Sequence, residues 1–231
     1  MEEANEQKDE SIPSLQEFTE TFSSILRALC VDYAYVTEYL DRRTLWALDR
    51  LNPAQMSAQW TFFTYKNSLV LGVAKLLDGG KGSISLLKFI EHQTRYAGWK
   101  DFPSDRPFKK WKKSFRKWDQ KAATLKIFRD EKLAHNLARG GGSKRSKLSA
   151  YKDFEGNKEG KYIGVHREIF DQCLEGMVLL SWLLRLCRST SEDTLSSREW
   201  KELAVRDVND DVELYRAHHA ALLDLVTPTT K

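Results

Sequence analysis

The chain has 231 residues, of which 41% are hydrophobic and 30% are charged, with a formal net charge of +4 at pH 7. This length supports one substantial core with room for an appended subdomain, and the composition excludes a chain that is disordered throughout. The three cysteines, Cys30, Cys173 and Cys187, have no close pairing, so the sequence predicts neither a disulfide framework nor a zinc cluster.

The first ten residues are strongly acidic. They carry five acidic side chains against one lysine, and they lack the apolar core of a signal peptide. No apolar run in the chain approaches the roughly 18 to 20 residues that a bilayer span needs. We therefore expect a disordered acidic tail over residues 1–12, a cytoplasmic protein and no membrane partner.

The first predicted helix begins at a capping box. Ser14 and Glu17 are three residues apart, so the hydroxyl and the carboxylate can each accept a hydrogen bond from an orphan backbone N–H group. Apolar residues then recur at spacings of three and four, as an amphipathic helix requires. They are Leu15, Phe18, Phe22, Ile25, Leu29, Tyr33, Val36 and Leu40.

Asn52 and Pro53 predict the start of a second helix, with asparagine as the N-cap and proline in the first turn. Its apolar positions are Trp60, Phe63, Leu69, Val70, Val73, Leu76 and Leu77. The glycines of "DGGKGS" predict its end, and residues 83–94 predict a shorter third helix.

A helical pattern returns over residues 106–137. Its stripe consists of Phe108, Trp111, Phe115, Trp118, Ala122 and Leu125. Residues 139–162 are a glycine-rich basic loop, residues 166–188 are apolar on one face, and residues 195–225 predict one or two further helices. The predicted fold class is an all-α bundle, with a helical domain over residues 13–189 and a helical extension over residues 190–231.

Arg129 occupies the next position of that stripe, where an apolar residue is expected. A buried guanidinium is costly unless it is paired or binds an anion. Two interpretations stay open. The side chain either holds an anion, or it extends from the edge of the apolar face to the surface beside Asp130 or Asp119.

His135 also has two interpretations. It lies four residues after Glu131, so an exposed contact along one helix explains it without chemistry. Histidine is also the side chain best suited to proton transfer near neutral pH, and an arginine can hold a phosphate oxygen through paired N–H donors. Together these residue types can cleave an RNA phosphodiester. One takes the proton of the 2′-hydroxyl group, and the other stabilises charge on phosphorus.

The spacing of Arg129 and His135 favours a site shared between two chains. Six residues along a straight helix separate two side chains by about 9 Å of rise and about 120° of rotation, so one helix points them apart. Two copies around a two-fold axis would bring each pair next to its counterpart in a common cleft, and a bent helix end is the alternative.

The segment "RDEKLAHN", residues 129–136, resembles the signature of HEPN-domain proteins, in which an arginine is followed by a polar residue, four to six further residues and a histidine. Its "LAHN" ending resembles the branch related to the AbiU abortive-infection proteins. The segments "NSLVLGVAKLLDGG", residues 67–80, and "GSISLLKFI" are similar to that branch in the same order. The resemblance covers residues 15–188.

The resemblance implies a helical bundle, a homodimer and metal-independent endoribonuclease activity, with no cofactor. His135 would be the acid/base residue and Arg129 the phosphate clamp, while Asp130 would orient them and Asn136 would assist. It also implies a role in phage defence or as the toxin of a toxin–antitoxin pair, with an antitoxin protein as partner. Family members paired with a nucleotidyltransferase carry a tyrosine two residues after the histidine, where this chain has Leu137.

Two basic stretches are candidates for RNA binding. Residues 106–118 carry seven basic side chains and no acid, and "GGGSKRSK" follows the motif directly. Trp111, Phe115 and Trp118 lie at core spacing, so we expect them to pack inward while the lysines face water. The candidate contacts are Lys109, Lys110, Lys112, Lys113, Arg116, Lys117, Lys144, Arg145 and Lys147.

The remaining histidines, His92, His166, His218 and His219, have no second ligand at a persuasive spacing, and we predict no metal site. The sequence therefore predicts a homodimeric, metal-independent endoribonuclease. The alternatives are a non-catalytic helical module that binds RNA, nucleotide or a partner protein, and a plain dimerisation scaffold.

Overall fold

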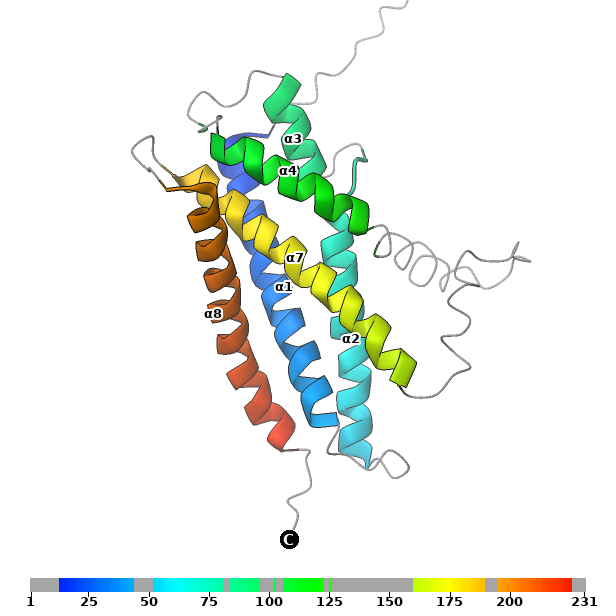
Figure 1. The fold of residues 1–231 in the computed structure, drawn as a ribbon. Helices are drawn as coiled ribbons and strands as arrows, with labels where there is room; N and C mark the ends of the chain where they lie inside the picture. The colour runs from blue at the N-terminus through cyan, green and yellow to red at the C-terminus, as the bar shows by residue number, and fades with distance from the viewer. Residues whose placement is uncertain are drawn as a thin grey trace, which may run out of the picture.

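The described part of this computed structural model comprises residues 13–43, 52–80, 84–95, 102, 106–122, 125, 160–189 and 195–225. These residues form helices, and no strand occurs among them, which confirms the all-α class (Figure 1). The helices are α1 (Leu15–Arg43), α2 (Pro53–Lys75), α3 (Leu86–Arg95), α4 (Arg106–Lys121), α7 (Gly160–Arg188) and α8 (Ser197–Asp224).

The helix starts predicted at Ser14 and Asn52 are confirmed, whereas the third helix, predicted over residues 83–94, is α3 and spans Leu86–Arg95. The Ser14 backbone N–H donates to Glu17 Oε2 at 2.6 Å, and the Glu17 N–H donates to Ser14 Oγ at 3.1 Å. Asn52 and Gln55 form the same reciprocal pair at the start of α2, with Pro53 as the first helical residue. Each box satisfies two of the N–H groups that a helix leaves without intrahelical partners.

Helix α7 begins earlier than the sequence predicted. It starts at Gly160 rather than at His166, so residues 160–162 belong to the helix and not to the preceding loop. Glycines at 160 and 164 lower the helix propensity of these first turns, and the apolar stripe begins only at Ile169. Residues 195–225 contain one continuous helix, α8, rather than two.

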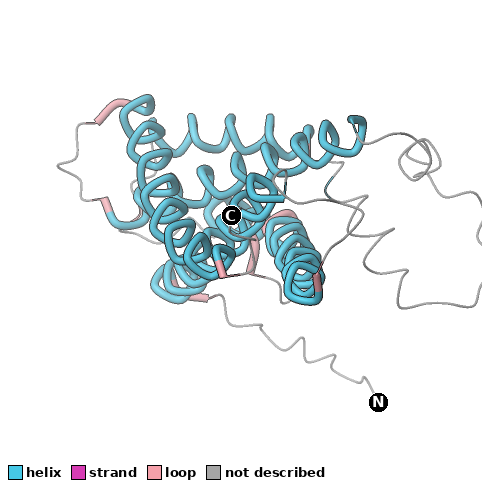
Figure 2. The backbone as a smooth tube through the Cα atoms, turned by 90° about the horizontal axis from the view of Figure 1, so that it is seen from below, coloured by secondary structure: helices cyan, strands magenta, loops and turns pink. Residues whose placement is uncertain are grey.

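Helix α1 lies between α2 and α8, and α7 crosses it (Figure 1). In the view from below, the described helices lie packed against one another (Figure 2). Their apolar residues join in one buried cluster that includes Trp200, Val208 and Leu223 of α8. Helix α8 therefore shares the core of the helices before it.

One glycine permits the close approach of α1 and α2. A Cβ atom on Gly72 would lie 2.8 Å from Leu29 Cδ2, closer than real Cβ contacts come. Nearby, the Tyr35 hydroxyl donates to the Ala58 carbonyl at 3.2 Å, and the Tyr39 ring stacks on Phe62 with centroids 4.5 Å apart. The inward face of α2 in its first half is thus formed by Ala58 and Phe62.

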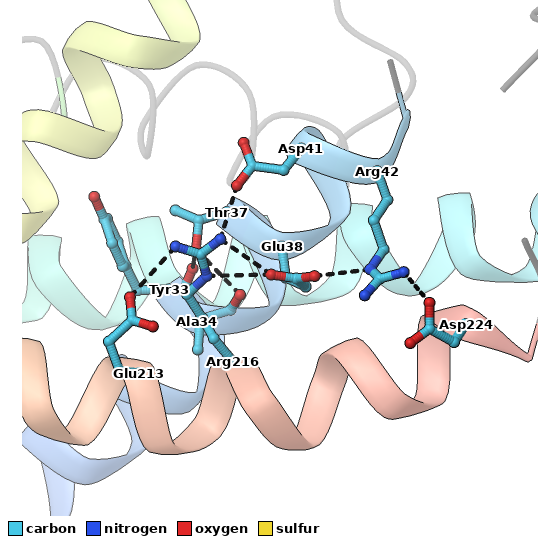
Figure 3. A network of polar contacts seen from close by, with 9 residues as sticks. All are labelled: Tyr33, Ala34, Thr37, Glu38, Asp41, Arg42, Glu213, Arg216 and Asp224. Atoms are coloured by element: carbon cyan, nitrogen blue, oxygen red, sulfur yellow. Dashed lines mark hydrogen bonds and ion pairs between the residues drawn. The ribbon is translucent and has the colours of Figure 1, made fainter. Parts of the chain in front are cut away.

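A polar clasp joins α1 to α8 (Figure 3). Glu38 accepts hydrogen bonds from Arg42 Nε at 2.7 Å and from Arg216 Nη2 at 3.1 Å, and its side chain is 11% exposed. Arg216 also pairs with Asp41 and Glu213, and Arg42 pairs with Asp224. A carboxylate shared by two guanidinium groups is compensated even where little water reaches it.

Among the helices described, none is long and apolar enough to cross a bilayer.

Candidate nucleic-acid interface

The inward face of α4 is aromatic and fully buried. Phe108, Trp111, Phe115 and Trp118 are between 0 and 5% exposed, and their rings follow one another along the helix. The indole N–H of Trp111 donates to the Leu179 carbonyl at 2.8 Å, and that of Trp118 donates to the Gln172 carbonyl at 2.9 Å. The predicted inward packing is confirmed, so these rings are not available to stack on bases.

These two hydrogen bonds fix the direction and rotation of α4. Because Trp111 bonds to the later α7 residue and Trp118 to the earlier one, α4 runs antiparallel to α7. The helices approach closely at Gly176, where a Cβ atom would lie 2.4 Å from Trp118 Cζ2. With its aromatic face held this way, α4 can present only its other face to solvent.

The outward face of α4 is cationic. Its basic residues Lys109, Lys110, Lys113, Arg116 and Lys117 are exposed, and Lys112 is half-buried. A shallow depression of about 550 Å³ runs along this face and is lined by Lys109, Lys112, Lys113, Arg116, Lys117 and Gln120. The six predicted RNA contacts in α4 therefore lie on one helix face.

Five of these cations form no ion pair with any residue that the structure describes. They are Lys109, Lys110, Lys113, Arg116 and Lys117. The neighbouring Lys121 approaches Glu175 of α7, with its Nζ 3.9 Å from Oε2. Unneutralised cations in a row create a positive potential that attracts a polyanion.

Two basic residues at the start of α4 oppose the stability of the helix. The first turn of α4 contains no acidic residue, and it holds Arg106 and Lys109. The N-terminus of a helix carries a partial positive charge, so basic side chains there are unfavourable, by about 0.3 to 1 kcal/mol each. This arrangement points to a use for the charge other than stabilising the fold.

The predicted catalytic residues lie outside the described residues. These are Arg129, Asp130, His135 and Asn136, and the same holds for the candidate RNA contacts Lys144, Arg145 and Lys147. The described residue nearest to the motif along the chain is Leu125. It is fully buried, and its N–H donates to the Ala122 carbonyl at 3.0 Å.

The three cysteines, all of them in described residues, are held in an unreactive state. Burial raises the pKa of the Cys30 and Cys187 thiols to about 12 and also raises that of Cys173, so these free cysteines are poor nucleophiles. His219 is buried and packs edge-on against both Tyr35 and Tyr65, whose rings stack on each other. In the described part of the chain, no group of three acidic, histidine or cysteine residues can hold a metal ion.

One surface was missed by the sequence analysis. Trp60 and Phe63 belong to the apolar pattern that predicted α2, yet they are 74% and 40% exposed, and Met56 beside them is 48% exposed. Helix α2 is apolar around much of its circumference, so periodicity does not select its buried side. The absence of charge between Asn52 and Tyr65 was the available signal for an uncharged outer face.

Comparison of the chain with protein-family models, with curated proteins and with solved structures finds no match. The assignment of a function therefore depends on the chemistry of α4 and of the segment that follows it.

Proposed function

We propose that this chain is an RNA-cleaving protein of HEPN type that binds RNA along α4 and cleaves it without a metal ion. The observation that carries the proposal is the cationic face of α4, on which five basic side chains form no ion pair within the described residues, on the helix that precedes the Arg129…His135 motif in the chain. The face supports binding, and the motif supports cleavage.

The binding step follows from charge. Helix α4 spans 16 residues, which corresponds to a length of about 24 Å, enough for several consecutive phosphates. Each phosphate that a lysine or arginine neutralises releases a counterion, so affinity falls steeply as salt is added. The buried aromatic face leaves little for base recognition on α4, and binding there is expected to tolerate many sequences.

The cleavage step uses Arg129 and His135. Leu125 is anchored in the core, and Arg129 follows four residues later, so their Cα atoms are at most about 14 Å apart. Along the chain, the motif follows the helix that carries the cationic face. His135 would take the proton of a 2′-hydroxyl group, whose oxygen attacks phosphorus as the bond to the 5′-oxygen breaks. Arg129 would hold the charged phosphoryl oxygens.

Cleavage needs a proton donor as well as a base, and two copies of the motif can supply both. The leaving 5′-oxygen needs a proton, and a second His135 across a two-fold axis is the natural donor. The products would be a 2′,3′-cyclic phosphate and a 5′-hydroxyl end. In this proposal the bundle is HEPN-like, Asp130 and Asn136 support the pair, and Lys144, Arg145 and Lys147 extend the RNA contact.

The biological setting is part of the same proposal. The similarity of residues 67–80 and 129–136 to AbiU-like proteins supports a cytoplasmic role in phage defence or as a toxin with an antitoxin partner. Because Leu137 stands where nucleotidyltransferase-paired members have tyrosine, we do not extend the proposal to control by tyrosine modification.

The second candidate is a module that binds RNA without cleaving it. The α4 face by itself favours this candidate, because salt-dependent binding needs the cations and not the motif. One measurement, the appearance of new RNA ends, distinguishes the two candidate functions.

The cleavage test uses purified full-length chain, single-stranded RNA of mixed sequence, and EDTA. We expect cleavage by the native chain, and a loss of at least about 100-fold in His135→Ala and Arg129→Ala. His218→Ala changes an exposed histidine of α8 and should leave the rate unchanged. Cleavage that survives in both motif variants would refute the catalytic assignment.

The binding test uses the His135→Ala chain, so that RNA remains intact. The double variant Lys113→Glu with Lys117→Glu should weaken binding and reduce the slope of log K against log salt by about 2. The matched control reverses two exposed cations of α8, Lys201→Glu with Arg206→Glu. An equal loss of affinity in both double variants would mean that net charge matters and that the α4 face does not.

A further inference from the structure

The outward face of α2 combines exposed apolar side chains with an absence of charge. Met56, Trp60 and Phe63 are 48%, 74% and 40% exposed, and their spacings of four and three place them in one stripe. No residue from Asn52 to Tyr65 is charged, although 30% of the whole chain is charged. We call the stripe and its uncharged neighbours Ser57, Thr61 and Thr64 the α2 outer face.

The composition of the α2 outer face is that of an interface centre. Single exposed apolar residues are common, but protein interfaces are distinguished by aromatic residues and methionine and by depletion of charge. The Trp60 and Phe63 rings meet edge to face, with centroids 6.3 Å apart. Lys66 Nζ lies 5.1 Å from the Phe63 ring centroid, close enough for a cation–π contact that holds this ring in place.

The same face carries both a projection and a hollow. Trp60 projects from it, and a shallow depression of about 490 Å³ beside it is lined by Pro53, Met56, Ser57, Trp60, Thr61 and Thr64. A two-fold interface joins one patch to an identical patch, so the patch must complement itself. A face with a projecting ring next to a hollow meets this condition, because each ring can enter the other copy's hollow.

We propose that the α2 outer face is the docking site for a second copy of this chain, with the two α2 helices crossing near Trp60. The chain carries a net charge of +4, and its α4 face would repel a second copy. The uncharged α2 outer face lets two like-charged copies approach without that cost. This assignment names the interface of the two-copy arrangement in the proposed function and rests on it in that respect.

Helix α2 is long enough to form a dimer interface of ordinary size. A stable interface buries about 800 Å² per partner, and one buried aromatic side chain contributes about 150 to 250 Å². Trp60 and Phe63 form the centre, and Ser57, Gln59 and Thr64 provide a polar rim. Helix α2, with 23 residues, is about 35 Å long, which leaves room for further contacts on either side of the crossing.

The test measures the mass of the full-length chain by analytical ultracentrifugation over a range of concentrations, without RNA. We expect the native chain to dimerise, and Trp60→Glu to raise the dissociation constant by at least about 30-fold. Trp60→Phe keeps an aromatic ring and should retain part of the affinity. Leu214→Glu places the same charge at another exposed apolar residue, 66% exposed on α8, and should leave the dimer unchanged.

The outcomes are distinct. A native chain that stays monomeric at tens of micromolar overturns the proposal, and so does a Trp60→Glu chain that remains a dimer. A monomer that binds neutral phosphatidylcholine vesicles through Trp60 would assign the face to a lipid surface instead. Thermal melting of Trp60→Glu checks the fold, which an exposed substitution should preserve.

Failure of this interface differs from failure of the proposed function. A dimer that loses its partner on Trp60→Glu but never cleaves RNA supports the interface and refutes the nuclease. His135-dependent cleavage by a dimer that Trp60→Glu leaves intact does the reverse.

Discussion

Helices α2 and α4 both pack aromatic side chains into the core, but their outward faces have different chemistry. Helix α4 buries Trp111 and Trp118 and exposes lysines and an arginine. Helix α2 buries Phe62 and exposes Trp60, Phe63 and Met56. Both buried faces contribute to the same core. Any difference in what the two helices bind must therefore come from their solvent-exposed faces.

The comparison also shows when a sequence pattern identifies a buried face. In α4 every large apolar residue lies on one side and every cation on the other, so only one rotation buries the aromatic stripe without burying charge. Helix α2 has apolar residues around much of its circumference. Its rotation is set by its neighbours, through the Gly72 contact with Leu29 and the Tyr35 hydrogen bond to Ala58.

The largest expected effect is on the buried face of α4. Trp118→Ala removes a side chain with no exposed area and its hydrogen bond to Gln172, and it should lower the free energy of unfolding by about 3 to 5 kcal/mol in urea titration. Phe63→Ala, on the outward face of α2, should lower the free energy of unfolding much less. Equal costs would mean that the two faces are not buried and exposed as described.

Gly176→Ala probes the same contact from the α7 side. Its Cβ would lie 2.4 Å from Trp118 Cζ2, so the ring or the helix must move. This movement should lower the free energy of unfolding by about 1 to 3 kcal/mol. Gly79→Ala is the matched control, since a Cβ there meets no atom within 4 Å.

A smaller effect should appear on the cationic face of α4. Lys109→Glu places an acid in the first turn, where it complements the helix dipole, and should raise the free energy of unfolding by about 0.3 to 1 kcal/mol. Lys117→Glu makes the same charge change near the C-terminus of α4 and should lower the free energy of unfolding slightly. Urea titration at low salt measures both.

RNA affinity should respond differently from stability. Both Lys109→Glu and Lys117→Glu remove a cation from the face lined by the α4 depression, so both should weaken RNA binding. A variant that is more stable yet binds less RNA would show that the charge of α4 serves binding. If Lys109→Glu binds RNA as well as the native chain, α4 loses its proposed role.

Much of this fold follows from local sequence. The capping pairs at Ser14 and Asn52 fix helix starts because both partners lie within one turn, and the α4 stripe fixes its buried side. The clasp around Glu38 does not follow, because Arg216 is 178 residues away and nothing in its own neighbourhood specifies that pairing. For the site, the sequence predicted the α4 cations, but the exposure of Trp60 depends on which of two apolar sides of α2 meets α1.

The smallest expected effect concerns the buried face of α2, where Tyr65 packs against His219 with ring centroids 5.8 Å apart. Burial lowers the pKa of His219 below its ordinary value of 6.5, and the neighbouring His218 adds to this effect. The unfolded chain then takes up a proton at higher pH than the folded chain. The free energy of unfolding should therefore fall as pH decreases from 6.5 through the lowered pKa.

His219→Phe should remove this part of the acid sensitivity, because phenylalanine keeps a ring packed against Tyr35 and Tyr65 but has no proton to gain. His218→Gln changes the exposed neighbour and should keep most of the slope. Urea titrations between pH 5 and 8 measure the difference. If the two variants lose the same slope, His219 titrates as it does in the unfolded chain, and the inner face of α2 admits more water than the buried face of α4.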